Sequence, residues 1–263
     1  MPAEGIDTMP DDRFWNWFHE IYESIPRQGP GDPDSTARAL RRIPPLTPAQ
    51  RILDIGCGSG TQTLDLAMGT EAQIVAIDSH APFVAQLAER AATSGHATRI
   101  SAQVGDMFAL PFPDGAFDVI WAEGSIFVIG FEEGLRAWRR LLVPGGYMAV
   151  TEFCWFRDDP DPELQEMFIE GCPAAANVQA RREVVAPSGY RLLADFVLPD
   201  NAWWDNYYVP LAASLERFRA LHADEPEALA VAARSQRELE LYLKHRGSYG
   251  YVFFVMQRDD THA

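Results

Sequence analysis

Three glycines at alternate positions, Gly56, Gly58 and Gly60, directly follow an apolar run at residues 51–55 that carries Asp54. Glycine lets a backbone pass close to a ligand, and the first turn of a helix after such a loop has N–H groups free to donate. An ordinary strand-to-helix turn needs fewer glycines than this. The spacing therefore predicts a ligand-binding loop between a strand and a helix.

Two well-known phosphate-binding loops do not fit this stretch. The dinucleotide pattern G-x-G-x-x-G requires a glycine at position 61, where Thr61 stands. The mononucleotide P-loop requires Gly-Lys-Ser or Gly-Lys-Thr after its glycines, and no such sequence follows. The pattern that remains is G-x-G-x-G behind an acid.

Two further acids follow apolar runs downstream. Asp78 ends the run at residues 73–77, and Asp106 stands after Gly105 behind the run at 99–104. A carboxylate can accept hydrogen bonds from both hydroxyl groups of a sugar, so Asp78 suits a ribose. Each acid also has a structural interpretation, as a helix N-cap for Asp78 and as a solvated turn residue for Asp106.

The elements that must position these residues alternate along the chain. Short apolar runs and helical periods follow one another from residue 50, which is typical of a parallel sheet with helices on its faces. We expect one domain, with a helical cap at 1–49 over the sheet edge, a core at 50–155 and a C-terminal part at 156–263 that holds an insertion. Strands are expected at 51–55, 73–77, 99–104, 117–121, 146–151, 190–198 and 249–257.

The composition of the 263 residues limits the possible partners. Lys and Arg total 22 against 38 Asp and Glu, and the net charge of −16 would repel a nucleic-acid backbone. Three cysteines without a C-x-x-C pair predict neither a disulfide framework nor a zinc site. Residues 1–12 are acidic, unlike a secretory leader, and no apolar stretch is long enough to span a membrane. We expect a cytoplasmic protein without nucleic-acid, membrane or metal partners.

The loop at 54–61 resembles the first motif of the class I S-adenosylmethionine-dependent methyltransferases. Asp78 and Gly105-Asp106-Met107 stand where this family holds the ribose and the adenine, and residues 142–146 resemble its turn before the fifth strand. More narrowly, the chain is similar to the ubiquinone-methylase-like (type 11) group of bacterial small-molecule methyltransferases. The shared stretches are Arg27-Gln28-Gly29-Pro30-Gly31, Trp121-Ala122-Glu123-Gly124-Ser125-Ile126, Ile129-Gly130-Phe131 and Gly250-Tyr251-Val252-Phe253.

The resemblance implies a Rossmann-like, mostly parallel sheet of seven strands with helices on both faces and a helical insertion before the last strand. It also implies S-adenosylmethionine as the cofactor and S-adenosylhomocysteine as its product. Glu123 would hold the amino group of the methionine part, and Arg27 and Gln28 would hold its carboxylate. The residues expected to bind the cofactor are Arg27, Gln28, Gly29, Asp54, Gly56, Gly58, Ser59, Gly60, Gln62, Asp78, Ser79, Gly105, Asp106, Met107, Glu123 and Gly124.

The acceptor site is expected between the cap and the late insertion, where aromatic residues concentrate. Their rings can enclose a sulfonium and an apolar acceptor, although core packing is the simpler interpretation for any single ring. Candidate catalytic bases are His19, Tyr22 on the same helix face, and Glu123. The residues expected to bind the acceptor are Trp15, Phe18, Trp155, Trp204, Tyr207 and Tyr208.

The sequence thus predicts an enzyme that moves a methyl group to an O, N or S nucleophile of a small molecule by in-line displacement. Two alternatives stay open. One is an NAD(P)-dependent oxidoreductase, which would share the loop and Asp78, and the other is a non-catalytic protein that binds the donor or its product. Many relatives carry a His or Asp pair after the fourth strand, where this chain has Glu123-Gly124-Ser125, so the acceptor is not identified.

Overall fold

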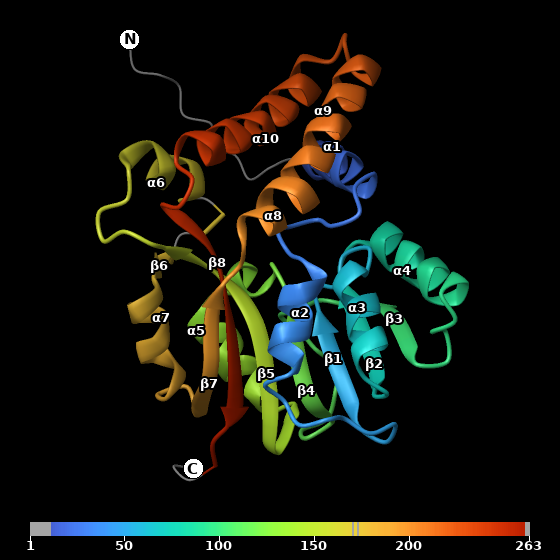
Figure 1. The fold of residues 1–263 in the computed structure, drawn as a ribbon. Coiled ribbons are helices and arrows are strands. Elements are labelled where there is room, and N and C mark those ends of the chain that lie inside the picture. Colours follow the sequence, from blue (N-terminus) through green and yellow to red (C-terminus); the bar gives the residue numbers. More distant parts are fainter. Residues whose placement is uncertain (1–11, 170, 173, 261–263) are drawn as a thin grey trace.

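The computed structural model describes residues 12–169, 171–172 and 174–260, and the acidic stretch at 1–11 lies outside them. One sheet runs through the molecule, with helices on its faces and a helical layer over one end (Figure 1). Its strands follow the order β3-β2-β1-β4-β5-β8-β7, and the short β6 pairs only with β5. Their bounds are β1 Arg51–Ile55, β2 Gln73–Asp78, β3 Ile100–Val104, β4 Phe117–Ala122, β5 Leu142–Trp155, β6 Ala176–Asn177, β7 Tyr190–Val197 and β8 Tyr249–Arg258.

The order of the strands fixes where a ligand can bind. β1 pairs in parallel with both β2 and β4, so the connections turn in opposite directions on its two sides. Open α/β sheets form a crevice at such a switch point, outside the carboxyl ends of the strands. β8 runs antiparallel between β5 and β7. The prediction of a Rossmann-like, mostly parallel sheet is confirmed, with β6 as an additional short strand.

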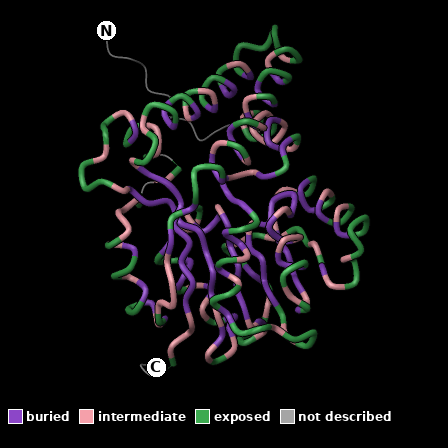
Figure 2. The backbone as a smooth tube through the Cα atoms, viewed as in Figure 1, coloured by how far each residue is buried: buried purple, intermediate pink, exposed green. Residues whose placement is uncertain are grey.

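The central strands are buried (Figure 2). Because such strands present alternate side chains to both sides, two apolar cores lie on the two faces of the sheet. Leu53 and Ile120 face the helices α5 and α7, whereas Ile52 and Trp121 face α2, α3 and α4. The bounds of the helices from α2 to α7 are α2 Pro33–Leu40, α3 Thr61–Gly69, α4 Ala81–Thr93, the 3-10 helix η1 Ile126–Val128, α5 Phe131–Arg139, α6 Pro162–Phe168 and α7 Val178–Val185.

Five elements form a helical lid over the carboxyl ends of the central strands (Figure 1). They are α1 Asp12–Glu23, α8 Asp200–Trp203, the π-helical turn η2 Trp204–Tyr208, α9 Val209–Leu221 and α10 Pro226–Lys244. The helices of the N-terminal cap expected at 1–49 lie in two different places (Figure 1). The apolar side chains of α1 find their partners in α9 and α10, while α2 lies on a sheet face against α3 and β8. No helix in the described part of the chain is long and apolar enough to cross a membrane.

Strand β5 begins at Leu142, four residues before the predicted strand. The turn expected at 142–146 lies inside the strand instead. Phe117 pairs with Leu142, the register then shifts, and Val119 pairs with Tyr147, while Gly145 takes a φ of +69°. Such a bulge bends a strand without ending it. At its other end β5 continues past β4 and extends the sheet beneath the lid.

Candidate functional site

The glycine loop connects β1 to α3, and its glycines have a steric reason. Gly56, Gly58 and Gly60 take φ values of +72°, +53° and +85°, which other residues rarely adopt. A Cβ atom on Gly56 would lie 2.4 Å from Ser125 Cβ, and one on Gly60 would lie 2.2 Å from Leu87 Cδ1. The loop is therefore pressed against the segment after β4 and against α4.

The backbone N–H groups of this loop are not free for a ligand, which corrects the interpretation from the sequence. Each N–H from residue 56 to residue 60 donates to an acceptor within the protein. The bonds run from Gly56 and Cys57 to the Ile77 carbonyl (both 2.9 Å), from Gly58 to Asp78 Oδ2 (2.9 Å), from Ser59 to Gln28 Oε1 (2.8 Å) and from Gly60 to the Cys57 carbonyl (3.0 Å). Instead of donors, the glycine loop provides a backbone that a ligand can approach closely.

A crevice of about 100 Å³ opens beside the loop at the switch point. It gathers residues from the ends of β1, β2 and β3 and from η1, which are distant in sequence. Its lining consists of Gly56, Ile77, Asp78, Ser79, Gly105, Asp106, Met107, Phe108 and Val128. The structure thus brings together the glycine loop and both acids that the sequence singles out.

Both acids in the crevice are held by backbone N–H groups. Asp78 Oδ1 accepts from His80 N and Oδ2 from Gly58 N, both at 2.9 Å. Asp106 Oδ1 accepts from Phe108 N at 2.9 Å. The N-cap interpretation of Asp78 is wrong, because His80 is the N-cap residue of α4. A fixed carboxylate with further lone pairs can still accept from two sugar hydroxyls.

Three lining residues of the crevice were missed by sequence reasoning, namely Ile77, Phe108 and Val128. The side chains of Phe108 and Val128 are 63% and 53% exposed, although they are apolar and stand at the rim. Apolar side chains beside a polar crevice favour the flat face of a ring as ligand. Phe108 follows Gly105-Asp106-Met107 closely and could have been found from that motif, whereas nothing in the local sequence marks Val128.

Asp54 lies fully buried beneath the loop with one oxygen unsatisfied. Its Oδ2 accepts from Thr63 Oγ1 at 2.6 Å, and its Oδ1 has no hydrogen-bond partner in the described part of the chain. Burial raises the pKa of this carboxyl group to about 7. A buried acceptor without a donor is costly, so Asp54 suits a ligand that carries an N–H group. Gln62, also predicted as a cofactor residue, donates to the Cys57 carbonyl at 2.9 Å and supports the loop.

Glu123 and Arg27 form a buried polar network next to the crevice. Arg27 donates to Asp65 Oδ2 at 2.8 Å and to Glu123 Oε2 at 3.3 Å. Glu123 Oε1 accepts from Thr36 Oγ1 at 2.7 Å and from Trp121 Nε1 at 2.9 Å. Burial raises the pKa of Glu123. These contacts favour a role for Glu123 in anchoring Arg27 over its expected role as a base.

Gln28 ties the lid to the glycine loop. Its Oε1 accepts from Ser59 N, and its Nε2 donates to the carbonyls of Tyr22 at 3.2 Å and Ile25 at 2.9 Å in and just after α1. A Cβ on Gly58 would lie 2.3 Å from Gln28 Oε1, so this glycine makes room for the amide. The amide is fully engaged, which favours support of the loop over contact with a carboxylate. Gly29 has open space around it in the described structure.

The two candidate bases on α1 lie in different surroundings. His19 stacks on His80 with ring centroids 3.8 Å apart, and burial together with His80 lowers its pKa. Tyr22 Oη pairs with Tyr207 Oη at 3.1 Å inside the lid, and burial raises the pKa of Tyr22 far above its usual range. Tyr22 therefore stays protonated at neutral pH. The structure does not join His19 and Tyr22 into one catalytic pair.

The aromatic residues predicted to bind the acceptor do not gather in one site. Phe18 packs on Tyr22, and the exposed Trp15 stands beside it on α1. Tyr207 and Tyr208 are buried in the lid, and Tyr208 Oη lies 3.1 Å from Glu238 Oε1. The other two predicted residues are Trp204, under the guanidinium of Arg246, and Trp155, at the end of β5.

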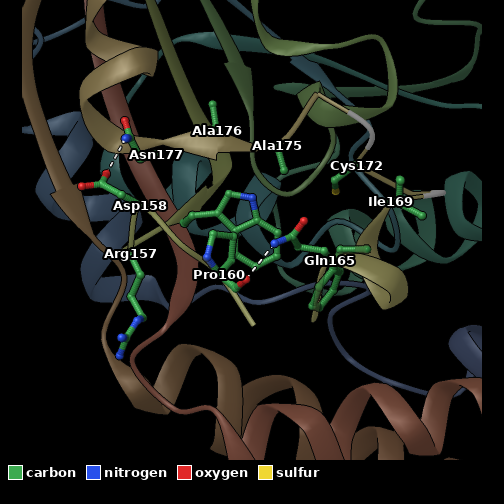
Figure 3. A pocket seen from close by; sticks show the side chains of 11 residues that line it. Arg157, Asp158, Pro160, Gln165, Ile169, Cys172, Ala175, Ala176 and Asn177 are labelled. Carbon is green, nitrogen blue, oxygen red and sulfur yellow. Dashed lines mark hydrogen bonds between the residues drawn. The ribbon is translucent and has the colours of Figure 1, made fainter. Parts of the chain in front are cut away.

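Trp155 lines a second, larger pocket of about 410 Å³, which we call the lateral pocket. It lies between the end of β5, β6 and α6, and its wall includes the amide of Gln165, bonded to the Pro160 carbonyl, and that of Asn177, bonded to Asp158 (Figure 3). The full lining is Trp155, Arg157, Asp158, Pro160, Gln165, Phe168, Ile169, Cys172, Ala175, Ala176 and Asn177. None of these residues lines the crevice.

One group of metal-ligating side chains occurs among the described residues, where the sequence indicated none. Asp161, Glu163 and His245 bring one ligand atom each within 4.8 Å of one another. Glu163 already pairs with Arg237 at 2.8 Å and also with Lys244. These cations neutralise the carboxylate, which favours a surface ion-pair cluster over a metal centre.

Several known proteins are similar to this chain in sequence or in fold. The methyltransferase domain family matches residues 52–146. The demethylmenaquinone methyltransferase of Mycolicibacterium vanbaalenii is 31% identical over 185 residues, which cover 68% of this chain and 72% of the relative. A SAM-dependent methyltransferase from Geobacter sulfurreducens, solved with S-adenosylhomocysteine, has a TM-score of 0.80 over 92% of this chain and 98% of that chain, at 22% identity. The (4+2) cyclase SpnF has a TM-score of 0.73 over 94% of both chains, also at 22% identity.

The two solved structures show a common fold, and the sequence relative goes further. For three other curated relatives, this chain spans only 34%, 47% and 57% of the length of the relative. The mycobacterial relative matches over more than two thirds of its own length. With this match, the glycine loop and the two crevice acids, the chain belongs to the class I S-adenosylmethionine-dependent methyltransferases, in the ubiquinone-methylase-like (type 11) group.

Proposed function

We propose that the protein is a methyltransferase that takes a methyl group from S-adenosylmethionine and moves it to a small molecule. The observation that carries this proposal is the position of Asp78. Its carboxylate is locked by the Gly58 and His80 N–H groups and lines the crevice together with Asp106. A rigid pair of acids beside a close-approach loop suits the ribose and the amino edge of an adenine.

The remaining groups around the crevice fit the other parts of this cofactor. Phe108 and Val128 would flank the adenine. Asp54 Oδ1 would accept a hydrogen bond from the amino group of the methionine part, and the Arg27 side chain would face the carboxylate of that part. When bound, the cofactor supplies an electrophilic methyl group on a sulfonium. The chain contributes orientation and exclusion of water, which can account for most of the rate in such a displacement.

The acceptor is a small molecule in this proposal, and the lateral pocket receives part of it. Relatives are named for phosphoethanolamine, sterols and demethylmenaquinone, all of them small molecules. The pocket volume falls within the range of ligand sites, and Trp155 and Phe168 provide apolar walls. Thr151 of β5 accepts from Gly124 N at the end of β4. Trp155 stands four residues further along β5, which corresponds to about 13 Å from Thr151 to Trp155 at roughly 3.3 Å per residue. An elongated acceptor with an apolar end would therefore fit.

Calorimetry with S-adenosylhomocysteine tests the cofactor. We expect saturable binding by the wild type and much weaker binding by Asp78→Asn, with NADH giving no heat. Binding of NADH and none of S-adenosylhomocysteine would overturn the proposal in favour of a dinucleotide enzyme. The acceptor can then be found by incubating protein and methyl-labelled donor with fractionated cell extract from a cytoplasmic preparation, the compartment that we also propose for the protein.

A ligand-binding role without methyl transfer is the second candidate. SpnF shares the fold over nearly the whole chain and is named for a cyclisation, so the fold alone does not require methyl transfer. Binding of S-adenosylhomocysteine without labelling of any extract fraction would favour this candidate.

A further inference from the structure

Two histidine rings lie stacked where the lid meets the crevice. His19 belongs to α1 of the lid, and His80 follows Asp78 and Ser79, which line the crevice. The two ring centroids are 3.8 Å apart, and the ring planes differ by 12°. Phe83 of α4 meets both rings edge-on. The stack therefore joins a helix of the lid to the segment that follows β2.

The backbone of His80 holds the acid that is proposed to bind the ribose. Its N–H donates to Asp78 Oδ1 at 2.9 Å, and the same residue is the N-cap of α4. The ring of His80 is held from two sides, because Glu23 Oε1 lies 2.6 Å from its Nε2 and the ring of His19 covers one of its faces. Since the ring and the N–H belong to one residue, the contacts of the ring help to keep Asp78 in place.

The stack tolerates one positive charge but not two. Glu23 accepts a hydrogen bond from the His80 ring whether that ring is neutral or charged. A further proton on His19 would place two positive rings face to face at 3.8 Å, where like charges repel. Burial and His80 lower the pKa of His19, whereas Asp78 and Glu23 act in the opposite direction. His19 is therefore neutral at neutral pH and takes up a proton only in mild acid.

Three other charged side chains of α1 and α4 are bonded elsewhere. The contacts are those of Arg13 with Glu227 and of Glu20 with His222, both at 2.9 Å, and that of Arg90 with the Ser59 carbonyl at 2.8 Å. The titratable groups that act on His19 are His80, Asp78 and Glu23. The charge on the stack is thus set within this small group, next to the crevice.

We propose that the stack of His19 on His80 positions Asp78 for the donor, and that donor binding weakens in mild acid, when both rings carry a proton. This inference rests on the proposed function, because the position of Asp78 matters only if the crevice holds the donor ribose. Repulsion would part the rings, separate α1 from the start of α4 and loosen the restraint on Asp78. Both histidines are positioning residues in this role, and neither exchanges a proton with the acceptor.

Calorimetry with S-adenosylhomocysteine at about pH 7.5 and about pH 5.5 tests this role. A site that requires a neutral histidine loses up to about tenfold in affinity per pH unit below the pKa of that histidine. His19→Phe keeps a stacking ring that takes no proton, so the ratio of the two affinities should be about threefold to tenfold larger in the wild type than in this variant. Asp54, with a pKa of about 7, also titrates in this range, but it contributes equally to both proteins.

Two further variants separate charge from position. His80→Ala keeps the N–H to Asp78 but loses the stack and the bond to Glu23, so it should bind about threefold to tenfold more weakly than the wild type at the higher pH. His222→Phe is the matched control, because His222 also meets α1 through a glutamate but does not line the crevice. Its ratio of affinities should equal that of the wild type.

The outcomes separate this inference from the proposed function. If S-adenosylhomocysteine does not bind the wild type at the higher pH, the proposed function fails. If it binds and the wild type and His19→Phe show the same ratio, or His80→Ala binds as tightly as the wild type, the role of the stack is overturned while the function stands. A second measurement needs no variant: saturation with S-adenosylhomocysteine should lower the pH midpoint at which the His19 ring protons titrate by NMR, because the donor prefers the neutral ring. An unchanged midpoint would contradict the inference.

Discussion

The crevice and the lid are built on different physical principles. In the crevice, backbone groups do most of the work: every loop N–H from residue 56 to residue 60 is paired, and Asp78 is held by two of the N–H groups around it. In the lid, side chains pack on one another, and hydroxyl pairs such as Tyr22–Tyr207 connect helices far apart in sequence. A backbone-built site is rigid and suits one fixed ligand, whereas a side-chain-built site can change its ligand by substitution.

The largest effect is expected where the backbone itself is disturbed. Gly56→Ala should weaken S-adenosylhomocysteine binding about 100-fold or more, because the left-handed conformation costs an alanine about 1–2 kcal/mol and its Cβ would also meet Ser125. Calorimetry measures this. Gly115→Ala is the control, since Gly115 has a φ of +65° but open space around it. Equal losses in binding for both variants would show that the crevice does not depend on this contact.

A smaller loss in affinity is expected at the carboxylate. Asp78→Asn replaces an acceptor by an amide N–H, and the loss of charged hydrogen bonds of about 1.5–3 kcal/mol corresponds to roughly 10–100-fold weaker binding. Asp106→Asn should lose less, because Asp106 holds no residue of the glycine loop. The reverse order of affinities, measured by the same titration, would place the main anchor at Asp106.

In the lid the expected effect is on stability. Burial raises the pKa of Glu238 to about 7, with Tyr208 and Arg234 acting in the opposite direction. The unfolded chain has the ordinary lower value, so the wild type loses stability as the pH rises from about 4.5 through 7. Glu238→Gln lacks this loss and should be relatively more stable at pH 8 than at pH 5, by roughly 1–3 kcal/mol in urea unfolding. Glu240→Gln, on the exposed side of the same helix, should show no such difference.

The smallest effect is expected for a single hydroxyl in the lid. Tyr22→Phe removes one hydrogen bond to Tyr207 and should lower the free energy of unfolding by about 0.5–1.5 kcal/mol, without changing donor affinity. Tyr190→Phe, whose hydroxyl bonds on the opposite face of the sheet, should behave alike. A clear drop in donor affinity for Tyr22→Phe alone would show that the lid takes part in donor binding.

The same contrast explains which features could be predicted from the sequence and which could not. Gly56, Asp78 and Asp106 carry their meaning in local spacing after a strand, so the sheet and the crevice were predicted. The partners of Glu123 could not be, since Thr36 and Arg27 reach it only through the fold. The expected pairing of His19 with Tyr22 follows helix periodicity, but tertiary packing directs the first to His80 and the second to Tyr207. The paired loop amides show that an unpaired N–H cannot be inferred from glycine content.

Gln28 connects the glycine loop at the crevice to the lid. Its amide group holds the loop at Ser59 and the end of α1 at Tyr22 and Ile25, and the N–H of nearby Gly31 donates to the Ala202 carbonyl of α8. Any coupling between occupancy of the crevice and order in the lid that passes through this amide would act with the same free energy in both directions.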